Sequence, residues 1–248
     1  MPLRVRSPVI GEAHVWVARV DVPPEQIARL DAVVTGEERA RAQRFRFQVL
    51  RDRFTATRAI RRLILAHYLD ADPQRLTFVR GPRGKPELVA DGSGGLRFNE
   101  SETQGLALFA LTRVSAVGVD VESVRPFDDA DRIVEMFASG LERQLFRHIP
   151  AGHRNAAFLR WWTGKEAYVK AVGTGLYQDL DTYSVSFDSP LRLLEADAGD
   201  ARRWSLVELR PAPGFTAALV VEGGPLHLRL LEWTDRYSEY HEPGGLRW

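Results

Sequence analysis

The chain has 248 residues, which is enough for one large domain or two small ones with a substantial core. Hydrophobic residues make up 44% of it and charged residues 27%, which is typical of a soluble globular protein. The net charge of +1 argues against a polyanion-binding role for the chain as a whole. Because the chain has no cysteine, disulfides, thiolate catalysis and cysteine-ligated metals are excluded. The six histidines are scattered, so any metal site must use carboxylates and favours a hard ion such as Mg²⁺.

No apolar run approaches the roughly 20 residues that a membrane helix needs, and the N-terminus has no signal-peptide pattern. We therefore expect a cytoplasmic protein with no membrane partner and no nucleic-acid partner. The cations are 31 arginines and three lysines, namely Lys85, Lys165 and Lys170. In so biased a composition, lysine at these positions indicates a requirement for a compact ammonium group.

In chain order, the first half begins with an alternating pattern over residues 14–20, which predicts a strand. Thr35 is a good helix cap because acidic residues follow it, and two helical patterns run from 39 to 70. Shorter strand patterns follow, separated by turns at 81–86 and 91–95. The strands are predicted at 76–79, 96–99 and 106–112.

The second half begins with the apolar strand pattern of residues 116–122. Three helices are predicted after it, at 128–137, 139–146 and 155–172. Gly173 and Gly175 end the last helix, since glycine suits the left-handed cap. Four strands are predicted next, at 182–187, 204–210, 216–221 and 226–233.

Each half thus contains a strand, then helices, then several strands. Segregated helices and strands favour an α+β fold over a doubly wound α/β fold. We expect two similar α+β halves at 1–115 and 116–240 and a tail at 241–248.

Two acids end the strand pattern of the second half. Asp120 and Glu122 are two residues apart, so both carboxylates project from one face of a strand. Two neighbouring carboxylates repel each other unless a cation or a proton joins them. The pair is therefore either a metal site or a strand end that reaches solvent.

Glu166 and Lys170 are four residues apart on a predicted helix and share a face. An exposed pair of this kind stabilises a helix by only about 0.2–0.5 kcal/mol. Tryptophan, tyrosine, alanine and valine surround this pair, however, and an isolated buried ion pair is costly. A third carboxylate beside Asp120 and Glu122 would complete a Mg²⁺ site, and the lysine would bind phosphate oxygens.

Nine arginines lie between residues 39 and 62. They form either a solvated helix face or, in part, a phosphate pocket, because arginine binds phosphate with two parallel hydrogen bonds. Lys85, between Gly84 and Pro86, would add a cation on a rigid turn.

Residues 118–122 (GVDVE) and 162–170 (WTGKEAYVK) resemble the two signature motifs of the 4′-phosphopantetheinyl transferases. The resemblance is to the surfactin-synthetase-activating type, and it continues through 173–176 and 180–185. Upstream, the segments at 84–86 and 98–101 and the basic helices of 37–62 are similar to family motifs in the same order. The resemblance covers nearly the whole chain.

This resemblance implies an enzyme that is a monomer of two halves related by a pseudo-two-fold axis, with the active site between them. It would transfer the 4′-phosphopantetheine group of coenzyme A to a serine of an apo carrier protein (acyl, aryl or peptidyl), with Mg²⁺, releasing 3′,5′-ADP. Such carriers belong to fatty acid, polyketide or nonribosomal peptide synthesis, and the last two are secondary metabolism.

The resemblance also implies roles for individual residues. Asp120, Glu122 and Glu166 would hold Mg²⁺, and Glu166 would help to take the proton from the serine. Lys170 would neutralise the pyrophosphate and assist departure of 3′,5′-ADP. The phosphates of coenzyme A would be held by further side chains: Arg41, Arg53, Lys85 and Ser101.

One position departs from the family pattern. The family has a phosphate-binding histidine where this chain has Glu102, and Glu100 lies two residues before it. In an extended segment these acids share a face with Phe98, whereas Ser101 points the other way. Glu102 would then turn away from the phosphates and toward an arginine of the first helices. The alternatives are that a second cation sits beside it, or that the activity is weakened or changed.

Two other hypotheses remain. A catalytically weakened or silent homologue would bind coenzyme A or a carrier protein without transfer, and the two acids at 100 and 102 favour it. A nucleic-acid-binding module would use the arginine-rich helix, but the near-neutral net charge argues against it.

Overall fold

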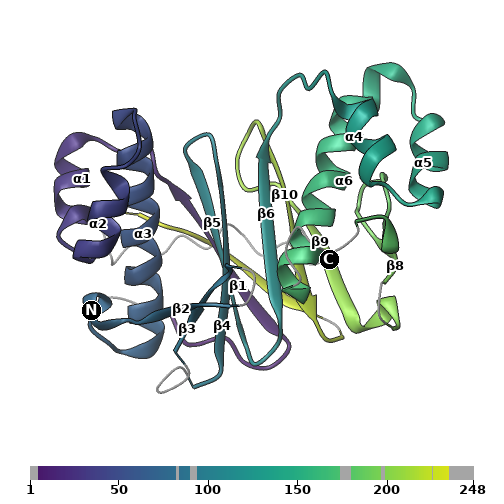
Figure 1. Ribbon diagram of the computed structural model, residues 1–248. Coiled ribbons are helices and arrows are strands. Elements are labelled where there is room, and N and C mark those ends of the chain that lie inside the picture. The colour runs from purple at the N-terminus through teal and green to yellow at the C-terminus, as the bar shows by residue number, and fades with distance from the viewer. Residues whose placement is uncertain are drawn as a thin grey trace.

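A computed structural model describes residues 5–81, 84–89, 94–173, 180–196, 199–224 and 226–234 (Figure 1). Residues 174–176 of the predicted motif, the glycine at 175 and the predicted tail at 241–248 lie outside these ranges. The molecule has four layers, with two sheets in the middle and a group of helices on each outer side (Figure 1). None of the helices in the described residues is both long enough and apolar enough to span a bilayer.

The elements of the first half comprise three helices, a 3₁₀ turn and five strands. In chain order they are β1 (Glu12–Arg19), α1 (Pro24–Asp31), α2 (Gly36–Ala42), α3 (Gln48–Leu69), the turn Pro73–Arg75, β2 (Phe78–Arg80), β3 (Pro86–Leu88), β4 (Leu96–Thr103) and β5 (Leu106–Arg113).

The second half has the same kinds of element. They are β6 (Val117–Ser123), α4 (Ala130–Phe137), α5 (Gly140–Arg147), α6 (Ala151–Val172), the turn Leu180–Thr182, β7 (Ser184–Val185), β8 (Leu193–Glu195), the turn Ala201–Arg203, β9 (Trp204–Leu209), β10 (Phe215–Glu222) and β11 (His227–Glu232).

The α+β fold is confirmed, and so are the predicted helix signals. The Thr35 hydroxyl accepts a hydrogen bond from the Glu38 N–H at 3.3 Å, and the Glu38 carboxylate accepts one from the Thr35 N–H at 3.1 Å. This reciprocal cap fixes the start of α2. Gly173 ends α6 in the left-handed conformation, with φ of 81°. Helix α1 was not predicted, although Pro24 in its first turn is a typical start signal.

The strand predicted at 182–187 is wrong in extent, because only Ser184–Val185 are extended in a ladder and a 3₁₀ turn precedes them. The carbonyls of Leu180 and Tyr183 accept hydrogen bonds from the buried Lys165 ammonium, each at 2.6 Å. These carbonyls are therefore engaged by a side chain in place of a neighbouring strand.

The first sheet has the strand order β11-β1-β5-β4, and the second has the order β6-β10-β9. Strand β1 is parallel to β11 and antiparallel to β5, whereas all pairs of the second sheet are antiparallel. The last described strand thus completes the sheet that begins with the first strand. The division at residue 115 and the pseudo-two-fold relation of the halves stay predictions.

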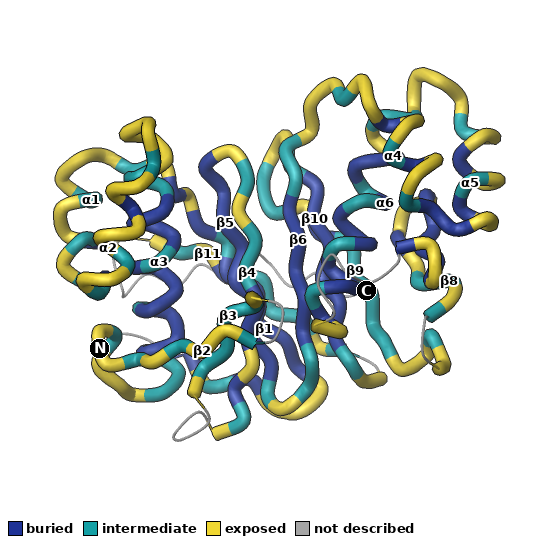
Figure 2. The backbone as a smooth tube through the Cα atoms, viewed as in Figure 1, coloured by how far each residue is buried: buried dark blue, intermediate teal, exposed yellow. Residues whose placement is uncertain are grey.

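Alternating side chains of β1 and β5 pack into two different cores. Figure 2 shows the central strands as mostly buried. On β5, Phe109 and Leu111 pack toward α3, whereas Leu108 and Ala110 pack against the second sheet. On the far side of the second sheet, α6 contributes Trp161, Tyr168 and other residues to a third core. The residues between the two sheets are buried, so the sheets pack face to face.

Strand β6 lies very close to α6. A Cβ atom placed on Gly118 would lie 2.1 Å from the Ala167 carbonyl oxygen and 2.4 Å from the Ala171 nitrogen. Because strand side chains alternate, Asp120 and Glu122 leave β6 on the same side as Gly118, the side that faces α6. The missing side chain of Gly118 therefore allows the contact that brings the two acids against the helix.

Replacing Gly118 with alanine should lower the free energy of unfolding by at least about 2 kcal/mol, because the added methyl group meets backbone atoms that cannot rotate away. The matched control is Gly152→Ala near the start of α6, where a Cβ meets nothing within 4 Å. Urea unfolding of both variants tests the expectation. Equal stability of Gly118→Ala and the wild type would contradict the close-packing argument.

Candidate active site

Strands β4 and β6 belong to different sheets but are joined by three side chains of β4. The Asn99 Oδ1 accepts a hydrogen bond from the Val119 N–H at 2.8 Å. The Ser101 hydroxyl donates to Asp120 Oδ1 at 2.8 Å, and the Thr103 hydroxyl contacts Glu122 Oε2 at 3.4 Å. The alternation of β4 therefore directs its polar face at the strand that carries the predicted metal ligands.

Asp120 lies at the centre of this arrangement. Its side chain is buried, and its Oδ1 accepts hydrogen bonds from the Lys170 ammonium at 2.6 Å and from Ser101. Its other oxygen, Oδ2, is buried and has no hydrogen-bond partner among the described residues. A buried carboxylate oxygen without a partner is costly, so this atom is suited to a cation that the protein itself does not supply.

Glu122 and Glu166 share an unfavourable environment. Burial raises the pKa of Glu166 most, the charges of Asp120 and Glu122 raise it further, and Lys170 opposes them. Burial also raises the pKa of Glu122, with Asp120 as the next cause. The three carboxylates are thus close enough to repel one another, and one lysine neutralises them only in part.

Within the described ranges, no three His, Asp or Glu side chains already surround a single metal position. The donor set nevertheless fits Mg²⁺, which prefers carboxylate oxygens and keeps several water ligands. The Asp120 Oδ2 has no partner among the described residues, and the raised pKa values show that the ionised forms of Glu122 and Glu166 are disfavoured. A bound cation would stabilise all three carboxylates.

Lys165, which precedes Glu166, has a different task from Lys170. Its ammonium is fully buried and donates to Glu142 Oε2 at 2.9 Å. Glu142 also accepts hydrogen bonds from the Trp161 indole and the Val185 N–H. This network fixes the face of α6 opposite the acids. Glu142 was missed in the sequence, although Ser139 three residues earlier forms a capping-box pattern with it.

Besides Lys170, three cations are predicted to bind phosphate, and they lie in different settings. Arg53 makes a two-pronged ion pair with Asp21, at 2.6 and 2.8 Å, so its guanidinium is already engaged. Arg41 is exposed on α2, with its guanidinium 5.7 Å from the centre of the Phe54 ring. Burial lowers the pKa of Arg41 first, and the nearby charges of Arg80 and Arg58 lower it further.

Lys85 joins the two halves. Its ammonium donates to the Val117 carbonyl at 2.9 Å and to the Lys170 carbonyl at 2.7 Å. Burial lowers the pKa of Lys85 to about 8. Two of its three N–H groups therefore hold the start of β6 and the end of α6 together, and its predicted contact with phosphate stays a prediction.

The two acids of β4 share the face that packs on α3, as predicted from the alternation. Glu100 makes the arginine contacts, a close ion pair with Arg58 and a longer one of 3.5 Å with Arg61. Glu102 instead accepts a hydrogen bond from the Thr57 hydroxyl at 2.7 Å. The expected arginine pairing of Glu102 is therefore wrong, because Thr57 of α3 binds Glu102 and the arginines of α3 pair with Glu100 instead.

Residues 116–220 match the 4′-phosphopantetheinyl transferase superfamily. The 4′-phosphopantetheinyl transferase HetI of Nostoc sp. is 38% identical over 216 residues, which are 86% of this chain and 88% of the relative. The chain belongs to this superfamily. A putative 4′-phosphopantetheinyl transferase of Synechocystis sp. is 29% identical over 80% of both chains. The transferase psf-1 of Bacillus pumilus is 31% identical over 64% of this chain and 66% of its own length.

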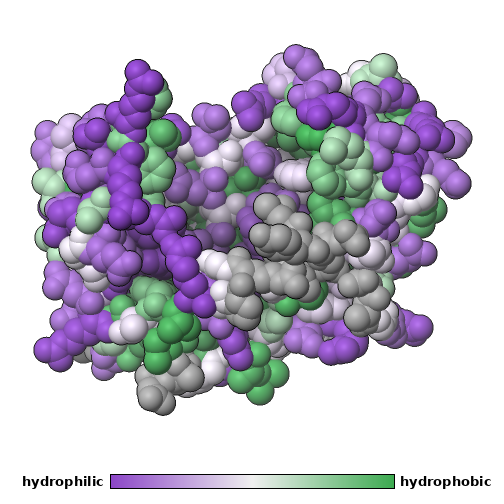
Figure 3. Space-filling view, in the orientation of Figure 1, coloured by the Kyte–Doolittle hydropathy of each residue, from purple (hydrophilic) through white to green (hydrophobic). Residues whose placement is uncertain are grey.

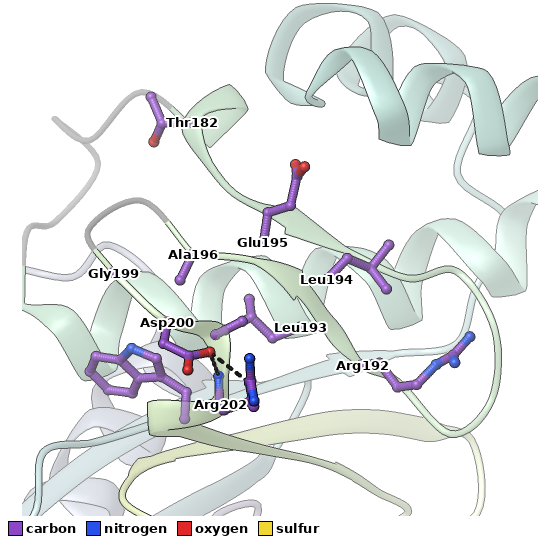
Figure 4. Close-up of a pocket in the computed structure, with 11 residues that line it drawn as sticks. Thr182, Arg192, Leu193, Leu194, Glu195, Ala196, Gly199, Asp200 and Arg202 are labelled. Atoms are coloured by element: carbon purple, nitrogen blue, oxygen red, sulfur yellow. Dashed lines mark hydrogen bonds and ion pairs between the residues drawn. The ribbon is translucent and has the colours of Figure 1, made fainter.

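The transferase also has an open pocket of about 860 Å³ in its second half (Figure 4). Leu193 and Glu195 of β8 and Trp204 of β9 contribute to its walls, with Asp200 and Arg202 bonded to each other at one side (Figure 4). Its lining shares no residue with the predicted site.

Removing the charge of Glu166 should stabilise the metal-free transferase. The pKa of Glu166 is raised in the folded state, so its ionised form opposes folding at pH 7. Glu166→Gln should raise the Tm by about 2–4 °C, the shift that about 1 kcal/mol produces in a chain of this size. The increase in Tm should become smaller as the pH falls toward 4.5, the ordinary pKa of a glutamate, because Glu166 of the wild type is then protonated.

Thermal scans with and without Mg²⁺ complete this test, with sodium chloride at equal ionic strength as the control. Mg²⁺ should raise the Tm of the wild type but change that of Glu166→Gln much less. If Glu166→Gln melts below the wild type at pH 7 without metal, burial and the neighbouring carboxylates do not disfavour the ionised form of Glu166.

Proposed function

We propose that the transferase moves the 4′-phosphopantetheine group of coenzyme A to a serine of an acyl, aryl or peptidyl carrier protein, with Mg²⁺, and releases 3′,5′-ADP. The observation that supports this most is the convergence of Asp120, Glu122, Glu166 and Lys170 where β6 meets α6, with one buried carboxylate oxygen unpartnered. Membership of the superfamily supports the class of reaction.

In the proposed reaction, the serine oxygen of the carrier forms a bond to the phosphorus that bears the pantetheine arm. The bond from that phosphorus to the pyrophosphate bridging oxygen breaks, and 3′,5′-ADP takes the electron pair. Asp120, Glu122 and Glu166 would hold Mg²⁺, which supplies charge neutralisation to the pyrophosphate.

Glu166 would accept the serine proton, directly or through a water molecule. Its raised pKa supports this role, because a carboxylate of higher pKa is a stronger base than an ordinary glutamate. Lys170 would stabilise the negative charge that develops on the leaving 3′,5′-ADP. Its position beside Asp120 Oδ1, on the last turn of α6, places an ammonium next to the proposed metal ligands.

The nucleotide end of coenzyme A would bind along the first half. Arg41 is the best supported of the predicted cations, because it is exposed and lies near the like charges of Arg58 and Arg80. A phosphate placed among these arginines would relieve their repulsion. Lys85 and Ser101 would contact phosphates from the β4 side, and Arg53 would do so only by sharing its contact with Asp21.

The alternative of a weakened or silent homologue rests on Glu100 and Glu102. Arg58 and Arg61 neutralise Glu100, so one of the two acids no longer argues for it. Two further proposals come from the resemblance: the protein is a monomer, and it acts in fatty acid, polyketide or nonribosomal peptide synthesis. The proposed cytoplasmic location comes from the sequence pattern.

The central test is mass spectrometry of apo carrier proteins after incubation with coenzyme A and Mg²⁺. The wild type should add the mass of one phosphopantetheine, whereas Asp120→Ala and Glu166→Ala should each reduce the rate by at least about 10³-fold, because each would lose a metal ligand. Asp188→Ala, at an exposed site in the second half, is the control. Retained activity in either site variant would remove that residue from the mechanism.

Glu102→His should tighten the binding of coenzyme A several-fold at low ionic strength, where charge repulsion is least screened. The physical reason is that Glu102 lies near Arg58 and Arg53, cations of the proposed nucleotide site, and within the described residues it is held by Thr57 without an ion pair. Calorimetric titration with coenzyme A at low and high salt measures the effect. Glu102→Gln separates simple loss of repulsion from a contact that needs the imidazole. Equal affinity of the histidine variant and the wild type at both salts would mean that Glu102 does not repel phosphate.

A further inference from the structure

Three apolar side chains are exposed where α2 connects to α3. Phe47, Val49 and Leu50 retain 58%, 50% and 39% of their accessible surface. Figure 2 shows this connection in yellow, as exposed, and Figure 3 shows a molecular surface that is mostly hydrophilic from the same side. A group of neighbouring apolar side chains on a hydrophilic surface marks a place where another molecule docks.

Unpaired positive charge accompanies these side chains. Arg44 and Arg46 are exposed, and neither has a salt bridge within the described residues, in contrast to Arg39 and Arg53. Asp52, the acid of this stretch, accepts a hydrogen bond from Gln48. We call the residues Arg44, Arg46, Phe47, Val49 and Leu50 the Phe47 surface.

The backbone under the Phe47 surface is held in place. The Arg51 guanidinium donates to the Phe45 carbonyl at 2.8 Å and to the Arg46 carbonyl at 3.5 Å. The Phe45 ring packs on Phe54, with ring centres 5.4 Å apart. A surface that is already ordered loses little conformational entropy when a partner binds.

The Phe47 surface flanks the proposed transfer site. Thr57 of α3 contacts Glu102 of β4, and the next polar residue of β4, Thr103, contacts the proposed metal ligand Glu122. Leu50 precedes Thr57 by seven residues, which is about 10 Å along the helix at 1.5 Å per residue. A small domain that presents a serine to the site would therefore be within reach of this surface.

We propose that the Phe47 surface docks the carrier protein, through an acidic helix that has apolar residues on the same face. This rests on the proposed function, because it takes the carrier as the substrate. The exposed arginines supply complementary charge, and the apolar side chains supply the desolvated centre of the contact.

Two double variants test the proposal in the full-length enzyme: Phe47→Ser with Leu50→Ser, and Arg44→Glu with Arg46→Glu. The matched controls are Leu141→Ser with Leu145→Ser on α5, which are 39% and 40% exposed, and Arg192→Glu with Arg202→Glu in the second half. A stand-alone apo acyl carrier protein is the probe, and its modification is followed by mass spectrometry at saturating coenzyme A.

Each Phe47-surface variant should raise the KM for the carrier protein at least about fivefold, as loss of an interface anchor does. The kcat and the KM for coenzyme A should stay at wild-type values. The increase in KM that charge reversal causes should become smaller as salt is added, because added ions screen exposed charges. The increase in KM of the serine variant should persist. The controls should match the wild type.

An unchanged KM for the carrier in both variants would overturn the proposal. A raised KM for coenzyme A would also overturn it, because it would assign the surface to the nucleotide. Wild-type binding to phosphatidylserine vesicles that both variants lose, with the KM for the carrier retained, would assign it to a membrane. A wild-type dimer in size-exclusion chromatography that both variants dissociate, again with that KM retained, would assign it to a second copy. A wild type that modifies no carrier protein would overturn the proposed function itself.

Discussion

The contact between β6 and α6 determines the site. A side chain on Gly118 would overlap the backbone of α6, so the strand and the helix approach more closely than any other residue would permit. That approach brings Asp120 within 2.6 Å of the Lys170 ammonium and places Glu166 in the field of two strand carboxylates. The close packing of Gly118 against α6 therefore determines which charged side chains meet at the site.

Two other elements hold this contact from opposite sides. Asn99, Ser101 and Thr103 connect β4 to β6, and the buried Lys165 and Glu142 fix the other face of α6. Each lysine has a separate function in this scheme. Lys85 donates to two backbone carbonyls, and Lys165 donates to two carbonyls and to the Glu142 carboxylate. Lys170 donates to the Asp120 carboxylate at the proposed metal site. A compact ammonium suits all three positions, because each must direct several N–H groups at close oxygens.

Much of this arrangement could be predicted from the sequence. Strand alternation correctly placed Glu100 and Glu102 on one face of β4, and the Thr35 cap and Gly173 marked two helix ends. Long-range pairing was beyond reach, since nothing local shows that β11 joins β1 or that Thr57 lies opposite Glu102. The setting of Arg53 was missed for the same reason: its partner Asp21 is 32 residues away, and only the fold brings them together. The sequence therefore predicted which charged and polar groups lie at the site. The tertiary contacts determine which of these groups are already bound to another side chain.

The parallel pairing of β1 with β11 has a consequence for the order of folding. During synthesis β1 emerges early, yet its neighbour on one side lies more than 200 residues further along the chain. Until that segment leaves the ribosome, β1 keeps an open hydrogen-bonding edge, which is a site for mispairing with other chains. Closing this pair also fixes a very long loop, so the first sheet is completed late, and the second half of the chain is synthesised before the first half is whole.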